Sequence, residues 1–249
     1  MKNTSPRISD KGTKMDLPLS VKRSRFRHDD PLAEHADAAF KEKAALIKRR
    51  DDYRCVYCAL QSKKYQEVHH LDDDHHNNDE SNLVTVCPLC HAVCHLGLSA
   101  RRKAGTLIYV DPSLGMKQAD LNALVRCLWV MERSKDKELQ ITSVGYQARL
   151  NRQVIKARRH YETSDPGLIA DILLGFSEED YRNRAQIFPG LLFLPQPTAF
   201  EPALRYWCES LFQQVQPDDW AAMSEDKAAR WLLGDDRSEL ALAEALGIT

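Results

Sequence analysis

The sequence lacks any apolar run long enough to cross a membrane. A transmembrane helix needs about 20 consecutive apolar residues. The longest apolar runs here, such as LLFL at residues 191–194, are far shorter than that. The first nine residues also lack the apolar stretch of a secretory signal. We therefore expect a soluble, cytoplasmic protein.

The sequence also lacks an excess of either charge. It contains 35 Lys and Arg residues against 36 Asp and Glu residues, for a formal net charge of −1. Any attraction to nucleic acid or to a membrane must therefore be local. Residues 1–30 are basic and poor in apolar side chains, which predicts a disordered basic arm. Such an arm either contacts phosphate or acidic protein, or is a solvated tail without a dedicated partner. Residues 216–249 predict an acidic helical C-terminal segment.

The remaining chain predicts a fold of the α+β class. Hydrophobic residues make up 43% of the 249 residues, enough for a core. We expect a lead-in helix at residues 31–50, a small metal module at 51–99 and a mainly helical body at 100–215. Within the module, residues 65–70 and 83–86 predict a hairpin with a long connection, and residues 88–98 predict one short helix with Pro88 in its first turn.

The body is predicted from apolar periodicity and caps. Residues 105–110 predict a strand, and residues 117–133 an amphipathic core helix. Further helices are expected at residues 146–161, after the cap at residues 164–166, after the cap at Ser177, at residues 201–214 and beyond Asp218. The helix at 146–161 carries five basic residues, which indicates either a solvated face or a face that binds phosphate or acidic groups; they are Arg149, Arg152, Lys156, Arg158 and Arg159.

Cysteine spacing gives the strongest chemical signal. Five of the seven cysteines lie between residues 55 and 94, and four of them form two C-x2-C pairs, Cys55/Cys58 and Cys87/Cys90. Two such pairs offer the four thiolates that a tetrahedral structural zinc requires, and this spacing indicates metal ligation rather than disulfides. The other three, Cys94, Cys127 and Cys208, are expected to pack as small hydrophobic residues.

Histidines gather in the same module. Six of nine lie there: His69, His70, His75, His76, His91 and His95. Residues four apart share one face of a helix, so the imidazoles of His91 and His95 can converge on one ion. His75, His76 and the aspartates at 72–74 are expected to be solvated loop residues.

This order of residues resembles the HNH endonucleases, whose pattern appears here as VHHL, SNLVTVC and CPLCHAVCH. The resemblance implies a ββα-metal module in which a general base activates water beside one divalent cation, Mg²⁺, Mn²⁺, Ni²⁺ or Zn²⁺. By this resemblance His69, His91 and His95 would hold the cation, His70 would be the base and Asn82 would orient it. The alternative is a module retained for its fold without turnover.

A second resemblance covers more of the chain. The segments RRDDYRCVYC, NNDESNLVTVC, GTLIYV, QADLNALVRCLW and ETSDPGLIADIL, in that order, resemble the IcmJ/DotN family of type IVB secretion systems. This resemblance implies a subunit without a transmembrane segment, peripheral at the inner membrane, which binds the coupling ATPase and helps to present cargo. The family's characterised members keep the four cysteines but lack the histidine site, which is filled here.

Two functions remain open on the sequence. One is a zinc-stabilised adaptor of a coupling complex, favoured by the large helical body. The other is an active endonuclease with DNA as its partner, favoured by the complete set of His70, Asn82 and the three ligand histidines.

Overall fold

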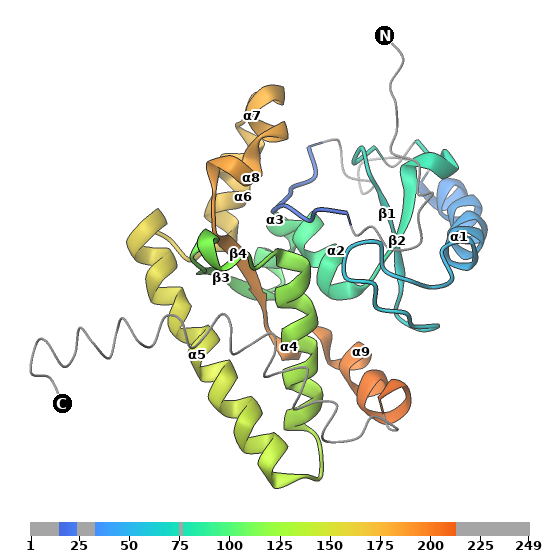
Figure 1. The fold of residues 1–249 in the computed structure, drawn as a ribbon. Helices are drawn as coiled ribbons and strands as arrows, with labels where there is room; N and C mark the ends of the chain where they lie inside the picture. The colour runs from blue at the N-terminus through green and yellow to red at the C-terminus, as the bar shows by residue number, and fades with distance from the viewer. Residues whose placement is uncertain (1–14, 24–32, 75–76, 213–249) are drawn as a thin grey trace, which may run out of the picture.

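A computed structural model describes residues 15–23, 33–74 and 77–212, with the backbone alone for residues 33–39. Helices and two small antiparallel sheets build the chain, in agreement with the α+β prediction (Figure 1). None of the helices in these residues combines the length and apolar character that a bilayer crossing would need. The predicted acidic segment at 216–249, His75, His76 and most of residues 1–30 lie outside the described residues.

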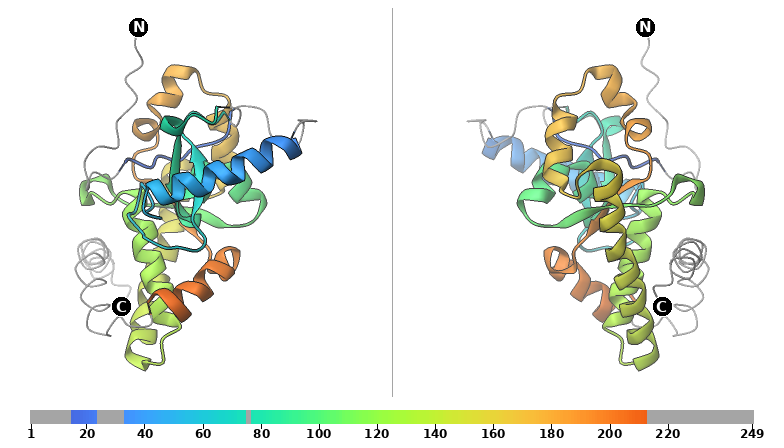
Figure 2. Two further views of the ribbon diagram at one scale, coloured as in Figure 1. Left: turned by 90° about the vertical axis from the view of Figure 1, so that its right-hand side faces the viewer. Right: turned by 90° about the vertical axis from the view of Figure 1, so that its left-hand side faces the viewer.

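The N-terminal module is built on a hairpin. Strands β1 (Glu67–His70) and β2 (Leu83–Val86) pair antiparallel, which confirms the predicted hairpin. His69 lies opposite Val84, and His70 lies opposite Leu83. Helix α1 lies across this hairpin (Figure 2), and its last residue, Arg50, donates to the carbonyl oxygens of Glu80 and Leu83. The elements are α1 (Ala33–Arg50), β1 (Glu67–His70), the 3-10 turn η2 (Glu80–Asn82), β2 (Leu83–Val86), α2 (Pro88–Cys94) and α3 (Leu96–Arg101).

The body combines the second sheet with long helices. Strand β3 (Gly105–Tyr109) pairs antiparallel with β4 (Leu191–Pro195). Every residue of β4 is buried, so the strand shows no alternation of apolar and polar residues and was not predicted from the sequence. The other elements are η3 (Pro112–Leu114), α4 (Gln118–Glu132), α5 (Lys137–Tyr161), α6 (Pro166–Leu174), α7 (Glu178–Arg182), α8 (Arg184–Ile187), η4 (Pro197–Phe200), α9 (Glu201–Tyr206) and the short π-helix η5 (Trp207–Leu211).

Helix ends follow the capping signals in the sequence. Asp165 accepts a hydrogen bond from the Gly167 amide at the start of α6, and Ser177 accepts one from the Asp180 amide at the start of α7. Helix α5 starts nine residues earlier than expected because Asp136 caps it there, accepting from the amides of Glu138 and Leu139.

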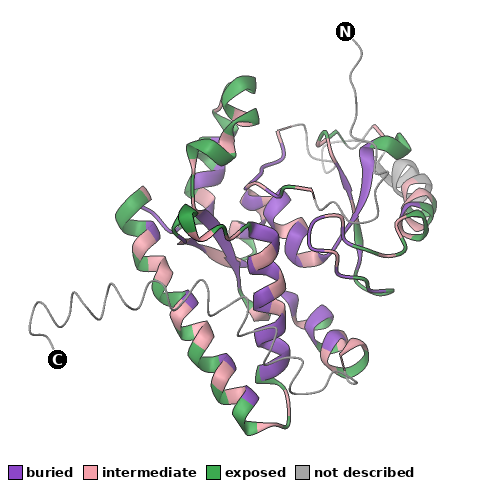
Figure 3. Cartoon of the chain, viewed as in Figure 1, coloured by how far each residue is buried: buried purple, intermediate pink, exposed green. Residues whose placement is uncertain are grey.

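Helix α4 is the central element of the core. It is buried on most sides, as Figure 3 shows, and packs against α5, β4 and the module helix α2. Leu121, Leu124 and Leu128 lie at helical spacing and are buried, which confirms the predicted core helix. The outer face of α5, in contrast, is exposed.

Residues 15–23 contradict the prediction of a disordered arm. Leu17, Leu19 and Val21 are buried in the core. The Ser20 amide donates to the Val93 carbonyl at 3.1 Å, and the Leu96 amide donates to the Ser20 carbonyl at 2.9 Å. The expected single helix at 88–98 is also wrong, because it breaks at His95 into α2 and α3. The two departures meet at Ser20, which pairs with the backbone groups that the break exposes.

The body holds the same segment from its other side. The Tyr181 hydroxyl accepts from the Val21 amide at 3.0 Å and donates to the Val21 carbonyl at 2.8 Å. Arg184 donates to the Leu19 carbonyl and stacks over the Tyr181 ring. The segment is therefore a bridge between the module and the helices α7 and α8.

Tyr181→Phe should detach this bridge in part. Two hydrogen bonds to Val21 are lost and its backbone groups stay unpaired, so we expect a loss of about 1–2 kcal/mol in stability, or a fall in Tm of roughly 2–8 °C. Thermal unfolding and limited proteolysis within residues 15–23 would measure the change. The same substitution at the exposed Tyr65 is the control; equal Tm values for both variants would contradict the bridge.

Candidate metal centres

Two tight turns bring the four paired cysteines together. Cys55 and Cys58 lie in a turn that the Cys55 amide closes by donating to the Leu60 carbonyl at 2.9 Å. Cys87 is the N-cap residue of α2 and Cys90 lies in its first turn, after Pro88. The two turns are joined by a hydrogen bond from the Val56 amide to the Thr85 carbonyl at 2.9 Å.

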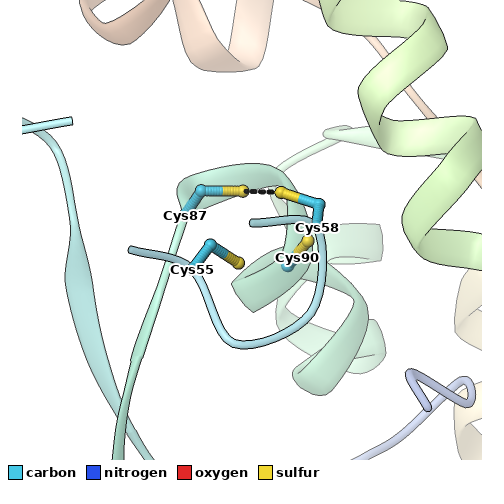
Figure 4. Close-up of side chains that lie close together, drawn as sticks. All are labelled: Cys55, Cys58, Cys87 and Cys90. Carbon is cyan, nitrogen blue, oxygen red and sulfur yellow. Dashed lines mark hydrogen bonds between the residues drawn. The ribbon is translucent and has the colours of Figure 1, made fainter. Parts of the chain in front are cut away.

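The sulfur atoms of these cysteines form a compact cluster (Figure 4). All four lie within 4.8 Å of one another, and the Cys58 and Cys87 sulfurs are 3.6 Å apart. A tetrahedral zinc with sulfur ligands at about 2.3 Å places its sulfurs about 3.8 Å apart. All four cysteines are free thiols and are buried, with 0–6% of their surface exposed. The donor set therefore fits one metal ion such as zinc.

The four thiols influence one another strongly. Hydrogen bonds from Cys55, Cys87 and Cys90, together with the positive charge of Arg126, hold the pKa of the Cys58 thiol well below its usual value. Burial and the neighbouring sulfurs raise the pKa of Cys90 well above it. Four thiolates in one buried space repel each other, so a cation is needed before all four can ionise.

Helix α4 of the body contacts this cluster directly. The Asn122 side-chain amide donates to the Cys90 sulfur at 3.4 Å, and the Arg126 guanidinium donates to the Cys58 sulfur at 3.7 Å. These two residues were not predicted as part of the site, although a polar residue at every fourth position of an apolar helix was the available signal.

Three histidines form a second cluster. His69 of β1, His91 of α2 and His95, the residue between α2 and α3, place ring nitrogens within 4.8 Å of one another. The Nε2 atoms of His91 and His95 are 3.1 Å apart, close to the ligand spacing of about 3.3 Å at a tetrahedral ion with bonds of about 2.0 Å. His95 lies beyond the end of α2 rather than on one helix with His91, yet its imidazole still reaches the cluster.

A carboxylate supports the second cluster from behind. Glu67 of β1 forms a hydrogen bond with Nδ1 of His91, which leaves Nε2 of His91 directed at the imidazole of His95. Carboxylates in this position orient histidine ligands at many metal sites. Glu67 was not identified from the sequence. His69 is buried, whereas His91 and His95 are partly exposed, so the cluster is accessible from one side.

His70 and Asn82, the expected base and its orienting residue, lie in a different environment from the three clustered histidines. His70 is 3% exposed, and its ring stacks on Phe40 of α1 with centroids 5.2 Å apart. Its Nε2 is 3.0 Å from the Asn78 side-chain oxygen. The Asn82 amide donates to Asp72 and to the Asn77 carbonyl, both at 2.8 Å, and so holds the loop that carries Asn78.

Known proteins were compared with the whole chain. No protein-family model matches it. The chain is 27% identical over 217 residues to the type 4 apparatus protein DotN of Legionella pneumophila, and the match covers 86% of this chain and 99% of that protein. This extended similarity supports the resemblance to the DotN family.

Cys87→Ser should abolish metal binding at the four-cysteine cluster and destabilise the module, because metal affinity at such a site contributes directly to folding. We expect a loss of several kcal/mol and a fall in Tm of roughly 10 °C or more. Metal content by mass spectrometry and thermal unfolding would test this. Cys208→Ser, at a partly exposed cysteine outside the cluster, is the matched control; a fully metallated Cys87→Ser protein would refute the assignment.

Proposed function

We propose that this chain is a zinc-stabilised subunit of a type IV secretion apparatus, which binds the coupling ATPase on the cytoplasmic side of the inner membrane and helps to present cargo. The observation that carries the proposal is the match along 99% of the length of a protein named as a type 4 apparatus component. A similarity confined to the cysteine pairs would support only a common metal motif.

The metal in this proposal is zinc, and the module is of the HNH type. Four thiolates in a closed, buried shell are typical of structural zinc and leave no position for substrate. The antiparallel hairpin followed by α2, with the cysteine turns beside it, is consistent with the ββα arrangement implied by the HNH resemblance.

The body supports a role in binding rather than in catalysis. Within the described part of the chain, both clusters with metal-binding geometry belong to the module and none to residues 104–212. These residues supply instead a large helical surface, on which Ile141, Val144 and Ile155 of α5 are exposed. Exposed apolar groups on a helical face favour interactions with other proteins.

A metal-dependent nuclease is the second candidate, and the assembled cluster of His69, His91 and His95 favours it. In this proposal the cluster holds a divalent cation, His70 removes a proton from water, and Asn82 orients the base through the loop of Asn78. The burial of His70 under Phe40 counts against it, because a general base must reach the water that it activates. The adaptor function is therefore preferred.

Adaptor function can be tested by co-purification with the C-terminal extension of the coupling ATPase from the same organism. Wild type and His70→Ala should bind it equally, because His70 belongs to the module and not to the body. Cys55→Ser should lose the partner, since it disrupts the zinc centre on which the fold depends. Absence of binding by the wild-type chain in the presence of zinc would contradict the proposal.

Nuclease activity can be tested by plasmid cleavage with Mg²⁺, Mn²⁺ or Ni²⁺. We expect no cleavage above the level of His70→Ala, because the His70 ring is buried and bonded to Asn78. Cleavage by the wild type that disappears in His70→Ala, with zinc content and Tm unchanged, would instead establish the second candidate.

A further inference from the structure

Three polar side chains form a stripe along the otherwise apolar face of α4. Gln118, Asn122 and Arg126 follow one another at intervals of four residues, so they share one side of the helix. Gln118 and Asn122 are buried. Such residues are costly in a core unless their hydrogen bonds are made, and here those bonds lead from the body sheet to the sulfur cluster.

The orientation of the first two amides follows from backbone groups. The Phe193 amide donates to the Gln118 side-chain oxygen at 2.8 Å, and the Gln118 nitrogen donates to the Phe193 carbonyl at 2.9 Å. A backbone N–H can only donate, so the two ends of the Gln118 amide cannot be exchanged. The Gln118 nitrogen also donates to the Asn122 oxygen at 2.9 Å. The Asn122 nitrogen must therefore point to the Cys90 sulfur, as observed at 3.4 Å.

Arg126 completes the stripe with a charge. Its guanidinium donates to the Cys58 sulfur at 3.7 Å. A divalent ion with four thiolates carries a net charge of −2, and burying such a charge without compensation is expensive. Arg126 cancels half of it and donates to one sulfur, while Asn122 donates to another.

We propose that Gln118, Asn122 and Arg126 form the outer shell of the four-cysteine metal centre, so that the bound metal joins the N-terminal module to the helical body. The inference rests on the zinc centre of the proposed function. Asn122 and Arg126 act on the metal through the sulfurs, and Gln118 acts through Asn122, so all three are positioning residues. Donors to thiolate sulfur withdraw electron density from it, which slows protonation of the sulfur and release of the metal.

Spectroscopy of Co²⁺-loaded full-length protein tests this role. Arg126→Gln removes the charge, and Asn122→Asp keeps the acceptor for Gln118 but replaces the donor to Cys90 with a carboxylate. Both variants should shift the thiolate-to-Co²⁺ charge-transfer band to lower energy and lower metal affinity roughly 10- to 100-fold in competition with a chelator. Arg126→Lys should recover part of the affinity. A mere loss of packing would lower Tm without moving this band.

Arg133→Gln is the matched control, because Arg133 lies at the end of the same helix and pairs with Glu201 instead of a sulfur. It should leave band and affinity unchanged. Variants with the wild-type band and affinity would overturn the inference while the zinc centre stands. A wild-type chain that binds no metal would overturn the zinc centre as well, so the two failures are distinguishable.

A measurement on the wild type needs no variant. Removal of the metal by a chelator should increase hydrogen exchange at the α4 amides near Asn122 and Arg126 as well as in α2. Increased exchange confined to the module, with α4 unchanged, would contradict the proposal that the metal links the module to the body. This result would be decisive even if the variants failed to fold.

Discussion

The structure depends on one constraint: four sulfur atoms from two distant turns share a space the size of a single coordinated ion. The first turn follows α1 and the second begins α2, so closing the cluster fixes the hairpin between them. The hairpin in turn sets His69 beside His91, and α2 carries the second cysteine pair into contact with α4. The apolar residues of the module pack into one core that continues into the body, and the cluster adds a fixed point between its two turns.

Local chemistry explains what the sequence predicted. The cysteine pairs, the hairpin strands, the caps at Asp165 and Ser177 and the core helix α4 each depend on residues within a few positions of one another. Spacing alone was enough to identify them. The histidine cluster needed more than spacing: His91 and His95 were paired by their spacing of four residues, whereas His69 was added through the resemblance to the HNH endonucleases.

Features that depend on distant contacts were missed. Strand β4 forms only because β3 lies beside it, and nothing within LLFLP distinguishes a buried strand from a short apolar helix. Residues 15–23 belong to a basic N-terminal stretch, yet Leu17, Leu19 and Val21 are buried against residues far along the chain. Glu67 and Asn122 likewise gain their roles from partners far along the sequence, His91 and Cys90.

The break between α2 and α3 has a consequence for how the histidine cluster is maintained. The helix stops at His95, and Ser20 occupies the hydrogen-bonding positions beside the break, because it pairs with the Val93 carbonyl and the Leu96 amide. The residue that carries one of the three imidazoles, His95, therefore lies at a break that is hydrogen-bonded to a segment outside the module. Displacement of residues 15–23 would therefore change the position of the His95 imidazole indirectly, without any contact with the histidine cluster itself.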